Sequence, residues 1–229
     1  GDEAGTALTT GDSNIAIGFE ALKTEDANSF NVAVGHQALK VNNGGDANVA
    51  IGYQALTANT TANNNVAVGN GALAANTTGA LNVAVGAAAG EAFTEGGDNV
   101  ALGYNALTAD TLGSRSTALG RSTLQNQNFT TATNAYNVAI GYAAGDAVTT
   151  GVQNTLVGAL AGDAITTGFA NVAIGYQALS SDDVGTNTVA IGQNALFAQN
   201  FSTATAAHNV AVGQSAGASV TTGIQNTIV

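Results

Sequence analysis

A short pattern of apolar and polar positions recurs along the whole chain. Each unit reads Asn-Val-Ala-(Val/Ile)-Gly-x-x-Ala-(Leu/Gly), and a stretch rich in Thr, Asn, Gly, Asp and Ser separates it from the next unit. The residues one and three before the glycine are mostly β-branched and flank an Ala, so each unit predicts a short strand with two different faces. The polar stretch predicts turns, because it lacks the apolar spacing of a helix.

The glycine of this unit recurs at every seventeenth position, apart from two steps of twenty-one. The longer steps run from Gly120 to Gly141 and from Gly192 to Gly213, and a further unit begins at Asn226. One longer step and three ordinary ones separate Gly120 from Gly192, which indicates that a block of four units was duplicated. This glycine row consists of Gly18, Gly35, Gly52, Gly69, Gly86, Gly103, Gly120, Gly141, Gly158, Gly175, Gly192 and Gly213.

Two other positions of the unit are nearly invariant. The position four before the glycine, the asparagine row, is Asn in eleven of thirteen units, with Ser116 and Thr188 as exceptions. The position three after the glycine is Ala in eleven of twelve. We expect a glycine corner, an alanine row where coils approach closely, and stacked amides that bond to one another or to the turn backbone. The expected ladder residues include Asn31, Asn48, Asn65, Asn82, Asn99, Gly35, Gly52, Gly69, Gly86, Gly103, Ala38 and Ala55.

A unit of seventeen is too short for a helix-turn-helix repeat but suits one coil of a solenoid. The sequence therefore predicts an all-β fold, a parallel β-solenoid or β-roll of about 13 coils, with residues 1–229 as one repetitive segment without an internal domain boundary. The chain begins at Gly1 and stops inside a strand unit at Val229. We expect it to be a piece of a longer fibre, because an open sheet edge invites further pairing.

Two units carry extra bulk on the alanine side of the strand. Leu156 and Ile228 replace the central Ala, and Thr155 and Thr227 replace the Val before them. We interpret this as a compensation between the two strand faces. Both faces are then packed, one inside the coil and the other against a second chain.

Composition narrows the functional classes. Charged residues make up 8% of the chain, against roughly 25% in ordinary soluble domains, and there is no Cys. A formal net charge of −11 with only four Lys and Arg argues against binding to nucleic acids or to anionic membranes. No apolar run approaches the length of a membrane span, so we expect no membrane insertion in this segment.

The sequence offers little material for catalysis or for cofactor binding. Its two histidines, His36 and His208, occupy different positions of the repeat, so no Ser-His-Asp set can be assembled around them. Acidic residues lie in the turns without the spacing of a calcium site, which favours turn capping over metal binding. We therefore expect no enzyme activity, no cofactor and no metal site.

Aromatic residues supply the candidates for surface recognition. Several follow the glycine row directly, and others lie in the two enlarged loops, residues 125–136 and 197–208, which we expect roughly 19 Å apart. Packing at a corner or between subunits is the alternative role for the residues after the glycine. The candidates are Tyr53, Tyr104, Tyr176, Phe129, Tyr136, Phe201 and His208.

The best-matching units are residues 48–56 and 171–179, which both read Asn-Val-Ala-Ile-Gly-Tyr-Gln-Ala-Leu. They resemble the head repeats of trimeric autotransporter adhesins and, more closely, the repeats of phage tail-fibre proteins. The resemblance implies a left-handed β-roll, three chains around a threefold axis, and a location on a virion or a cell surface. Unlike the adhesin heads, this chain places Val or Thr directly after the Asn in every unit but the first, where Ile15 follows Asn14.

These observations lead to one expected function and several alternatives. We expect a structural and adhesive segment of an elongated homotrimeric extracellular fibre, most closely a phage tail fibre that attaches to a host. Its receptor would be a cell-surface glycan or protein. The alternatives are a bacterial trimeric surface adhesin, a monomeric ice- or glycan-binding solenoid and, with least support, a polysaccharide-degrading solenoid enzyme.

Overall fold

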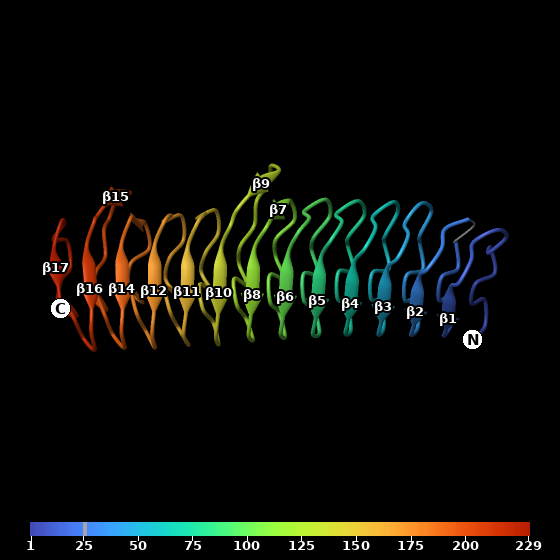
Figure 1. The fold of residues 1–229 in the computed structure, drawn as a ribbon, viewed down its shortest axis with the longest axis horizontal. Helices are drawn as coiled ribbons and strands as arrows, with labels where there is room; N and C mark the ends of the chain where they lie inside the picture. Colours follow the sequence, from blue (N-terminus) through green and yellow to red (C-terminus); the bar gives the residue numbers. More distant parts are fainter. Residues whose placement is uncertain (25–26) are drawn as a thin grey trace.

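The chain winds into a rod in which each coil contributes one strand to a single parallel sheet (Figure 1). The computed structural model describes residues 1–24 and 27–229, and no helix occurs among them. The thirteen strands of this main sheet are β1 (Ile15–Ile17), β2 (Val32–Val34), β3 (Val49–Ile51), β4 (Val66–Val68), β5 (Val83–Val85), β6 (Val100–Leu102), β8 (Thr117–Leu119), β10 (Val138–Ile140), β11 (Thr155–Val157), β12 (Val172–Ile174), β14 (Val189–Ile191), β16 (Val210–Val212) and β17 (Thr227–Ile228). The predicted parallel β-solenoid is confirmed.

Beside each enlarged loop, two short strands lie outside the main sheet, one from the enlarged coil and one from the coil before it. They form two parallel pairs, β7 (Gly113–Ser114) with β9 (Thr133–Asn134), and β13 (Gly185–Thr186) with β15 (Thr205–Ala206). Both pairs lie along one edge of the rod, where the loop around β9 projects furthest (Figure 1).

Successive strands pair without any slip in register. Ala33 of β2 lies opposite Ala50 of β3, and the same position of the unit is paired along the main sheet. The register also holds across the first enlarged coil, where Ala118 pairs with Ala139. The four additional residues are therefore accommodated entirely in the loop and leave the strands in line.

Hydrogen bonds between coils continue beyond the strands into the turns. The backbone N–H of Leu56 donates to the carbonyl of Ala72 at 2.9 Å, and Thr60 donates to Thr77 at 2.9 Å. Both bonds join equivalent or neighbouring positions of adjacent coils. Much of the turn backbone is thus paired with the next coil, which satisfies polar groups that burial would otherwise leave without a partner.

The glycine row forms the corner that follows each strand. Gly52 has φ of +132°, and a Cβ atom there would lie 2.5 Å from the carbonyl oxygen of Gly69 in the next coil. The same conformation and the same close approach recur in other coils, for example at Gly69 beneath Gly86. Both predicted reasons for glycine at this corner, a positive φ and a close backbone approach, are confirmed.

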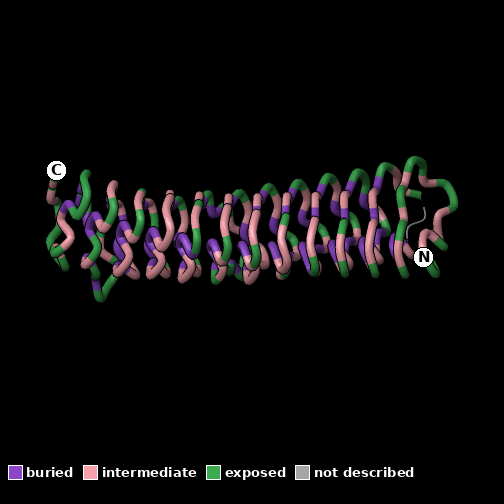
Figure 2. The backbone as a smooth tube through the Cα atoms, turned by 90° about the horizontal axis from the view of Figure 1, so that it is seen from below, coloured by how far each residue is buried: buried purple, intermediate pink, exposed green. Residues whose placement is uncertain are grey.

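The core is a narrow row of small side chains that runs along the inside of the rod. The central Ala of a typical strand, such as Ala50, is fully buried, as are Ala55 and Leu56 after the corner. Buried positions follow the interior through the coils, whereas exposed positions lie along the edges (Figure 2). The alanine side of the strand is therefore the inside of the coil, and the valine side faces outward.

Two interior positions, three residues apart, complement each other in size. Where the first is Leu, the second is polar, as in Leu73 and Asn76; where the first is Gly, the second is a large apolar residue, as in Gly90 and Phe93. A Cβ atom on Gly90 would lie 2.8 Å from the ring of Phe93. The other glycine pairs are Gly145 with Val148, Gly162 with Ile165, and Gly217 with Val220.

The large side chains of Leu156 and Ile228 are also explained by interior glycines, which leave space for them in the core. A Cβ atom on Gly145 would lie 2.6 Å from Cδ1 of Leu156, and one on Gly217 would lie 2.8 Å from Cδ1 of Ile228. The large side chains thus fill interior space that the glycines leave. Our interpretation of a compensation with Thr155 across the strand is replaced by this contact within the core.

We predict that Gly52→Ala destabilises the rod severely, by roughly 3 kcal/mol or more, because the new Cβ collides with a backbone carbonyl that cannot move alone. Gly71→Ala is the matched control, since its φ is +67° and its nearest contact would be a flexible Glu91 oxygen at 3.6 Å. It should cost only about 1 kcal/mol. Urea denaturation followed by circular dichroism measures both, and equal losses would contradict the account of the corner.

We further predict that Gly90→Leu and Phe93→Asn rescue each other. The first change alone overfills the core, and the second alone leaves a cavity and a buried amide. Together they reproduce the arrangement of Leu73 and Asn76. A double-mutant cycle of unfolding free energies should give a favourable coupling of about 1 kcal/mol or more, whereas additive losses would show that the two positions do not share the same space.

Candidate functional site

The asparagine row forms a buried ladder of amides along the rod. Nδ2 of Asn65 donates to the carbonyl of Gly79 at 2.9 Å, and its Oδ1 accepts the backbone N–H of Asn82 at 2.9 Å. Asn48 makes the equivalent bonds to Ala62 and to Asn65. Each amide thus closes its own turn and fixes the next coil, which is the structural role expected for this row.

The two exceptions in the row occur in the enlarged coils. There, Nε2 of the buried Gln127 donates to Ser116 Oγ at 3.1 Å, and Gln127 Oε1 accepts from Nδ2 of Asn137 at 2.8 Å. Gln199 makes the same two contacts in the duplicated block, with Thr188 and Asn209. A glutamine amide therefore takes the place of the missing asparagine where the loop is longer.

A buried carboxylate joins each of these glutamines to the enlarged loop. Asp110 accepts hydrogen bonds from Gln127 Nε2 at 2.6 Å, from the Gly113 N–H at 3.0 Å and from the Phe129 N–H at 3.2 Å. Burial raises the pKa of Asp110 above its ordinary value, and these hydrogen bonds partly offset the rise. Asp182 repeats the arrangement with Gln199 and Gly185, so both enlarged loops are anchored in the same way.

The enlarged loops divide the predicted recognition residues into two groups. Phe129 and Phe201 are each only 5% exposed, so their prediction as surface residues is wrong: both side chains are buried. Tyr136 and His208, at the ends of the loops, are exposed. Residues 130–132 and 202–204 are exposed as well.

The residues directly after the glycines form a corner row whose side chains stack on one another. The ring centroids of Phe19 and His36 lie 5.1 Å apart, and those of His36 and Tyr53 lie 5.3 Å apart. Further along, the Arg121 guanidinium carbon lies 5.7 Å and 6.0 Å from the rings of Tyr104 and Tyr142. Ring faces turned toward one another are unavailable to a sugar, so these contacts favour packing over glycan stacking.

The third predicted tyrosine of this row, Tyr176, lies between Ala159 and Gln193, one coil away on either side. Its side chain is 48% exposed. Binding by Tyr176 therefore stays a prediction.

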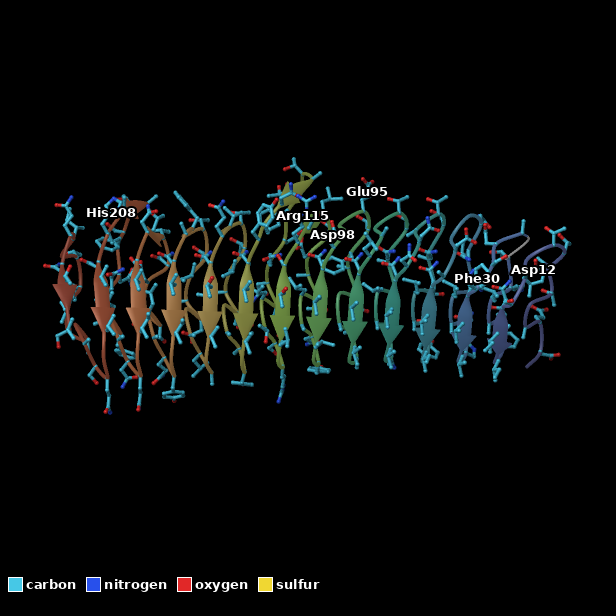
Figure 3. All side chains as sticks on the ribbon, viewed as in Figure 1. Asp12, Phe30, Glu95, Asp98, Arg115 and His208 are labelled. Carbon is cyan, nitrogen blue, oxygen red and sulfur yellow. The ribbon has the colours of Figure 1, made fainter. Side chains whose placement is uncertain are left out.

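Charged side chains meet at two places on the surface. Near the start of the chain, Glu20 accepts from Lys23, Lys40 and Gln37, which lowers its pKa to about 2. Beside the first enlarged loop, Arg115 lies 3.5 Å from a carboxylate oxygen of Asp98 (Figure 3). It also donates to the hydroxyl of Tyr136 at 2.8 Å.

Two carboxylates of like charge, Asp146 and Asp163, stack in adjacent coils. Burial raises the pKa of both, and the charge of Asp163 raises that of Asp146 further. By linkage, raised pKa values stabilise the fold at acidic pH. Their contribution is complete below about pH 3.9, the ordinary aspartate value, and is lost as the pH rises through the folded-state values.

The described part of the chain contains no group of three or more His, Asp or Glu side chains that could hold a metal ion. Residues 1–24 and 27–229 form no pocket. Among these same residues, no helix is long and apolar enough to cross a membrane.

Two outward rows of side chains follow the strands along the outside of the rod. Together we call them the outer strand face, the first and third positions of each strand unit. The first row consists of Ile15, Val32, Val49, Val66, Val83, Val100, Thr117, Val138, Thr155, Val172, Val189, Val210 and Thr227. The second consists of Ile17, Val34, Ile51, Val68, Val85, Leu102, Leu119, Ile140, Val157, Ile174, Ile191, Val212 and Val229.

Comparison with known proteins adds no relative: no family model, curated protein or solved structure matches the chain.

We predict that Asn65→Ala costs roughly 2–4 kcal/mol of unfolding free energy, because it leaves the buried Asn82 N–H without its acceptor and removes one of the two amide bonds to the Gly79 carbonyl, the other coming from Asn76. Asn70→Ala is the matched control: Asn70 lies five residues later on the exposed corner row. It should change stability by at most about 0.5 kcal/mol. Thermal and urea unfolding would measure both, and a neutral effect at Asn65 would show that the ladder does not stabilise the fold.

Proposed function

We propose that this chain is a structural and adhesive segment of an elongated homotrimeric extracellular fibre, most closely a phage tail fibre that takes part in host attachment. The role is mechanical rather than catalytic. The observation that carries the proposal is the unbroken register of thirteen parallel strands. It makes the segment a rod of roughly 58 Å at about 4.8 Å for each coil.

A rod of this kind suits the spacing and display of binding groups. Its coils are joined by backbone hydrogen bonds and by the asparagine row, so it resists bending where a flexible linker would not. The two enlarged loops are anchored alike, through Gln127 to Asp110 and through Gln199 to Asp182, and they project from one edge (Figure 1). They are the surface we propose for contact with a cell-surface glycan or protein, because loops held on a rigid scaffold commonly carry binding.

The resemblance of the repeats supports the trimeric state. A bacterial trimeric surface adhesin would use the same rod and the same loops, and it remains the alternative within this class of fibres. A coiled-coil stalk and a membrane barrel in the same protein would identify the adhesin.

The geometry does not favour an ice-binding solenoid. The hydroxyls of Thr60 and Thr77 are directed to carbonyl oxygens of the next coil at 3.0 Å, and the exposed row beside them continues as Glu95 and Leu112. The outer strand face carries mainly Val and Ile rather than Thr. A regular array of free threonine hydroxyls is therefore missing from the described residues.

Attachment can be tested with a fluorescently labelled segment and a panel of bacterial cells, with flow cytometry as the readout. The matched control lacks residues 130–133 and 202–205, a deletion that restores the ordinary coil length in both enlarged coils. We expect the intact segment to bind at least one cell type, and the shortened one to lose at least tenfold in affinity. Binding to no cell type, or equal binding by both forms, would contradict an adhesive role of the loops.

A further inference from the structure

We propose that the corner row contains a binding slot for one uncharged pyranose ring of a glycan, between Tyr142 and Tyr176. The floor of the slot is Ala159, which occupies the same position of the coil that lies between these two tyrosines. The slot follows the strands, whereas the enlarged loops precede them, so the two surfaces lie on opposite edges of the rod (Figure 1). The inference does not depend on the enlarged loops or on the number of chains in the fibre.

The spacing of the corner row leaves room for one ring above Ala159. Where two ring-bearing residues of this row occupy adjacent coils, as His36 and Tyr53 do, their ring centroids lie 5.3 Å apart. Tyr142 and Tyr176 are two coils apart, a rise of about 9.6 Å. The side chain of Ala159 ends at Cβ, so a ring placed above it lies about 5 Å from each tyrosine, which is the ordinary separation of stacked rings.

Both tyrosines that line the slot are accessible from outside the rod. Tyr142 is 54% exposed and Tyr176 is 48% exposed. The Arg121 guanidinium lies over one face of the Tyr142 ring from the coil before it, so the opposite face is directed toward the coil of Ala159. The residue that follows Tyr176 in the row is Gln193, on the side away from Ala159. The slot therefore begins at a tyrosine face that the arginine does not cover.

Ala159 differs from the other alanine of the corner row. Ala87 follows Asn70 and precedes Tyr104, so a ring above Ala87 would have a tyrosine on one side only. Ala159 has a tyrosine in the coil before it and in the coil after it. A ring can therefore be covered on both faces above Ala159 but not above Ala87, which makes Ala87 the matched control position.

The chemistry of the slot favours a pyranose over a flat aromatic group. The slot is open to water on its outer side, so its ligand needs a hydrated edge as well as faces that tolerate burial. A pyranose has hydroxyls around its edge, and the C–H bonds of its faces carry the partial positive charge that the negative face of a tyrosine attracts. The net charge of −11 disfavours an acidic sugar.

Two tyrosine walls also select the configuration of the sugar. All ring substituents of a β-glucopyranoside are equatorial, so both of its faces present only axial hydrogens. The galacto epimer has an axial 4-hydroxyl, which would lie against one of the two rings and lose its hydrogen bonds to water. We therefore expect a β-gluco-configured residue in the slot.

The experiment measures the binding of methyl β-D-glucopyranoside by saturation-transfer NMR titration, with methyl β-D-galactopyranoside as the epimer control. Ala159→Tyr fills the slot with a side chain that the row already carries in other coils, and Ala87→Tyr adds the same side chain outside the slot. Tyr176→Ala removes one wall. Tyr176→Phe keeps the ring, and Phe19 of the same row shows that a coil accommodates it.

We expect the unmodified chain to bind the glucoside about tenfold more tightly than the galactoside. Ala159→Tyr and Tyr176→Ala should weaken binding of the glucoside by about tenfold or more, whereas Ala87→Tyr and Tyr176→Phe should leave it unchanged. Circular dichroism verifies the fold of each variant. Tyr176→Ala changes only a half-exposed ring, so it decides the matter if Ala159→Tyr does not fold.

Three results would overturn the inference. The first is that the unmodified chain does not bind the glucoside, and the second is that a folded Ala159→Tyr or Tyr176→Ala variant binds it equally well. The third is equal binding of the galactoside, because a slot with two tyrosine walls would then not be the contact. None of these results contradicts the proposed fibre, whose enlarged loops are tested separately by attachment to cells.

Discussion

The hydrogen bonding of each coil to the next, at a spacing of about 4.8 Å, is the constraint on which the rest of this structure depends. It places every side chain directly beside its equivalent one coil away. A residue type is therefore acceptable only if it tolerates a neighbour of its own kind. Glycine at the corner allows the backbones of adjacent coils to approach closely, and alanine inside is small enough to stack. Asparagine between the loop and the strand forms hydrogen bonds to its own turn and to the next coil.

The same constraint explains why charge is so scarce. Stacked carboxylates repel, and the charge of Asp163 adds to burial in raising the pKa of Asp146. At two other acidic residues, hydrogen-bond donors or positive charges lie beside the carboxylate. Glu20 lies among two lysines and a glutamine, and the buried Asp110 is satisfied by Gln127 and two backbone N–H groups. Low charge is thus a consequence of the architecture as well as a feature of the outer strand face.

Stacking also offsets strain in the turns. Large residues such as Leu56 and Leu73 adopt φ of about +50°, a left-handed conformation that costs roughly 1–2 kcal/mol for each residue. An isolated turn would not hold leucine in this conformation. In the rod, these backbones are bonded to the neighbouring coil, and the leucine side chains fill the interior.

The repeat alone was enough to predict the coil, the glycine corner and a structural asparagine row, because each depends on a residue type that recurs in one position. Details that depend on three-dimensional contact could not be predicted. Phe129 has the sequence position of a surface loop residue, but its backbone bond to Asp110 draws the loop onto the rod. The stacking of Tyr53 on His36 depends on ring orientation, which the pattern does not specify.

Other details were visible in the sequence, but they could be interpreted only once the positions that share the interior of the coil were known. The pairing of Gly90 with Phe93 is present in the sequence, yet its meaning requires knowing that both positions share one interior space. The strand pattern likewise left open which face is inside, because both are apolar. Packing decides it: the coil is so thin that only Ala fits beside the Leu that follows the corner.

The most direct test of the account is amide hydrogen exchange, resolved along the chain by NMR. If hydrogen bonds between coils hold the structure together, the backbone N–H groups of the asparagine row in the central coils, such as Asn65 and Asn82, exchange most slowly. Protection should then fall toward the exposed loop residues 130–132. Exchange at Asn65 and Asn82 as fast as in that loop would contradict the account, because the amide ladder would then not be closed in solution.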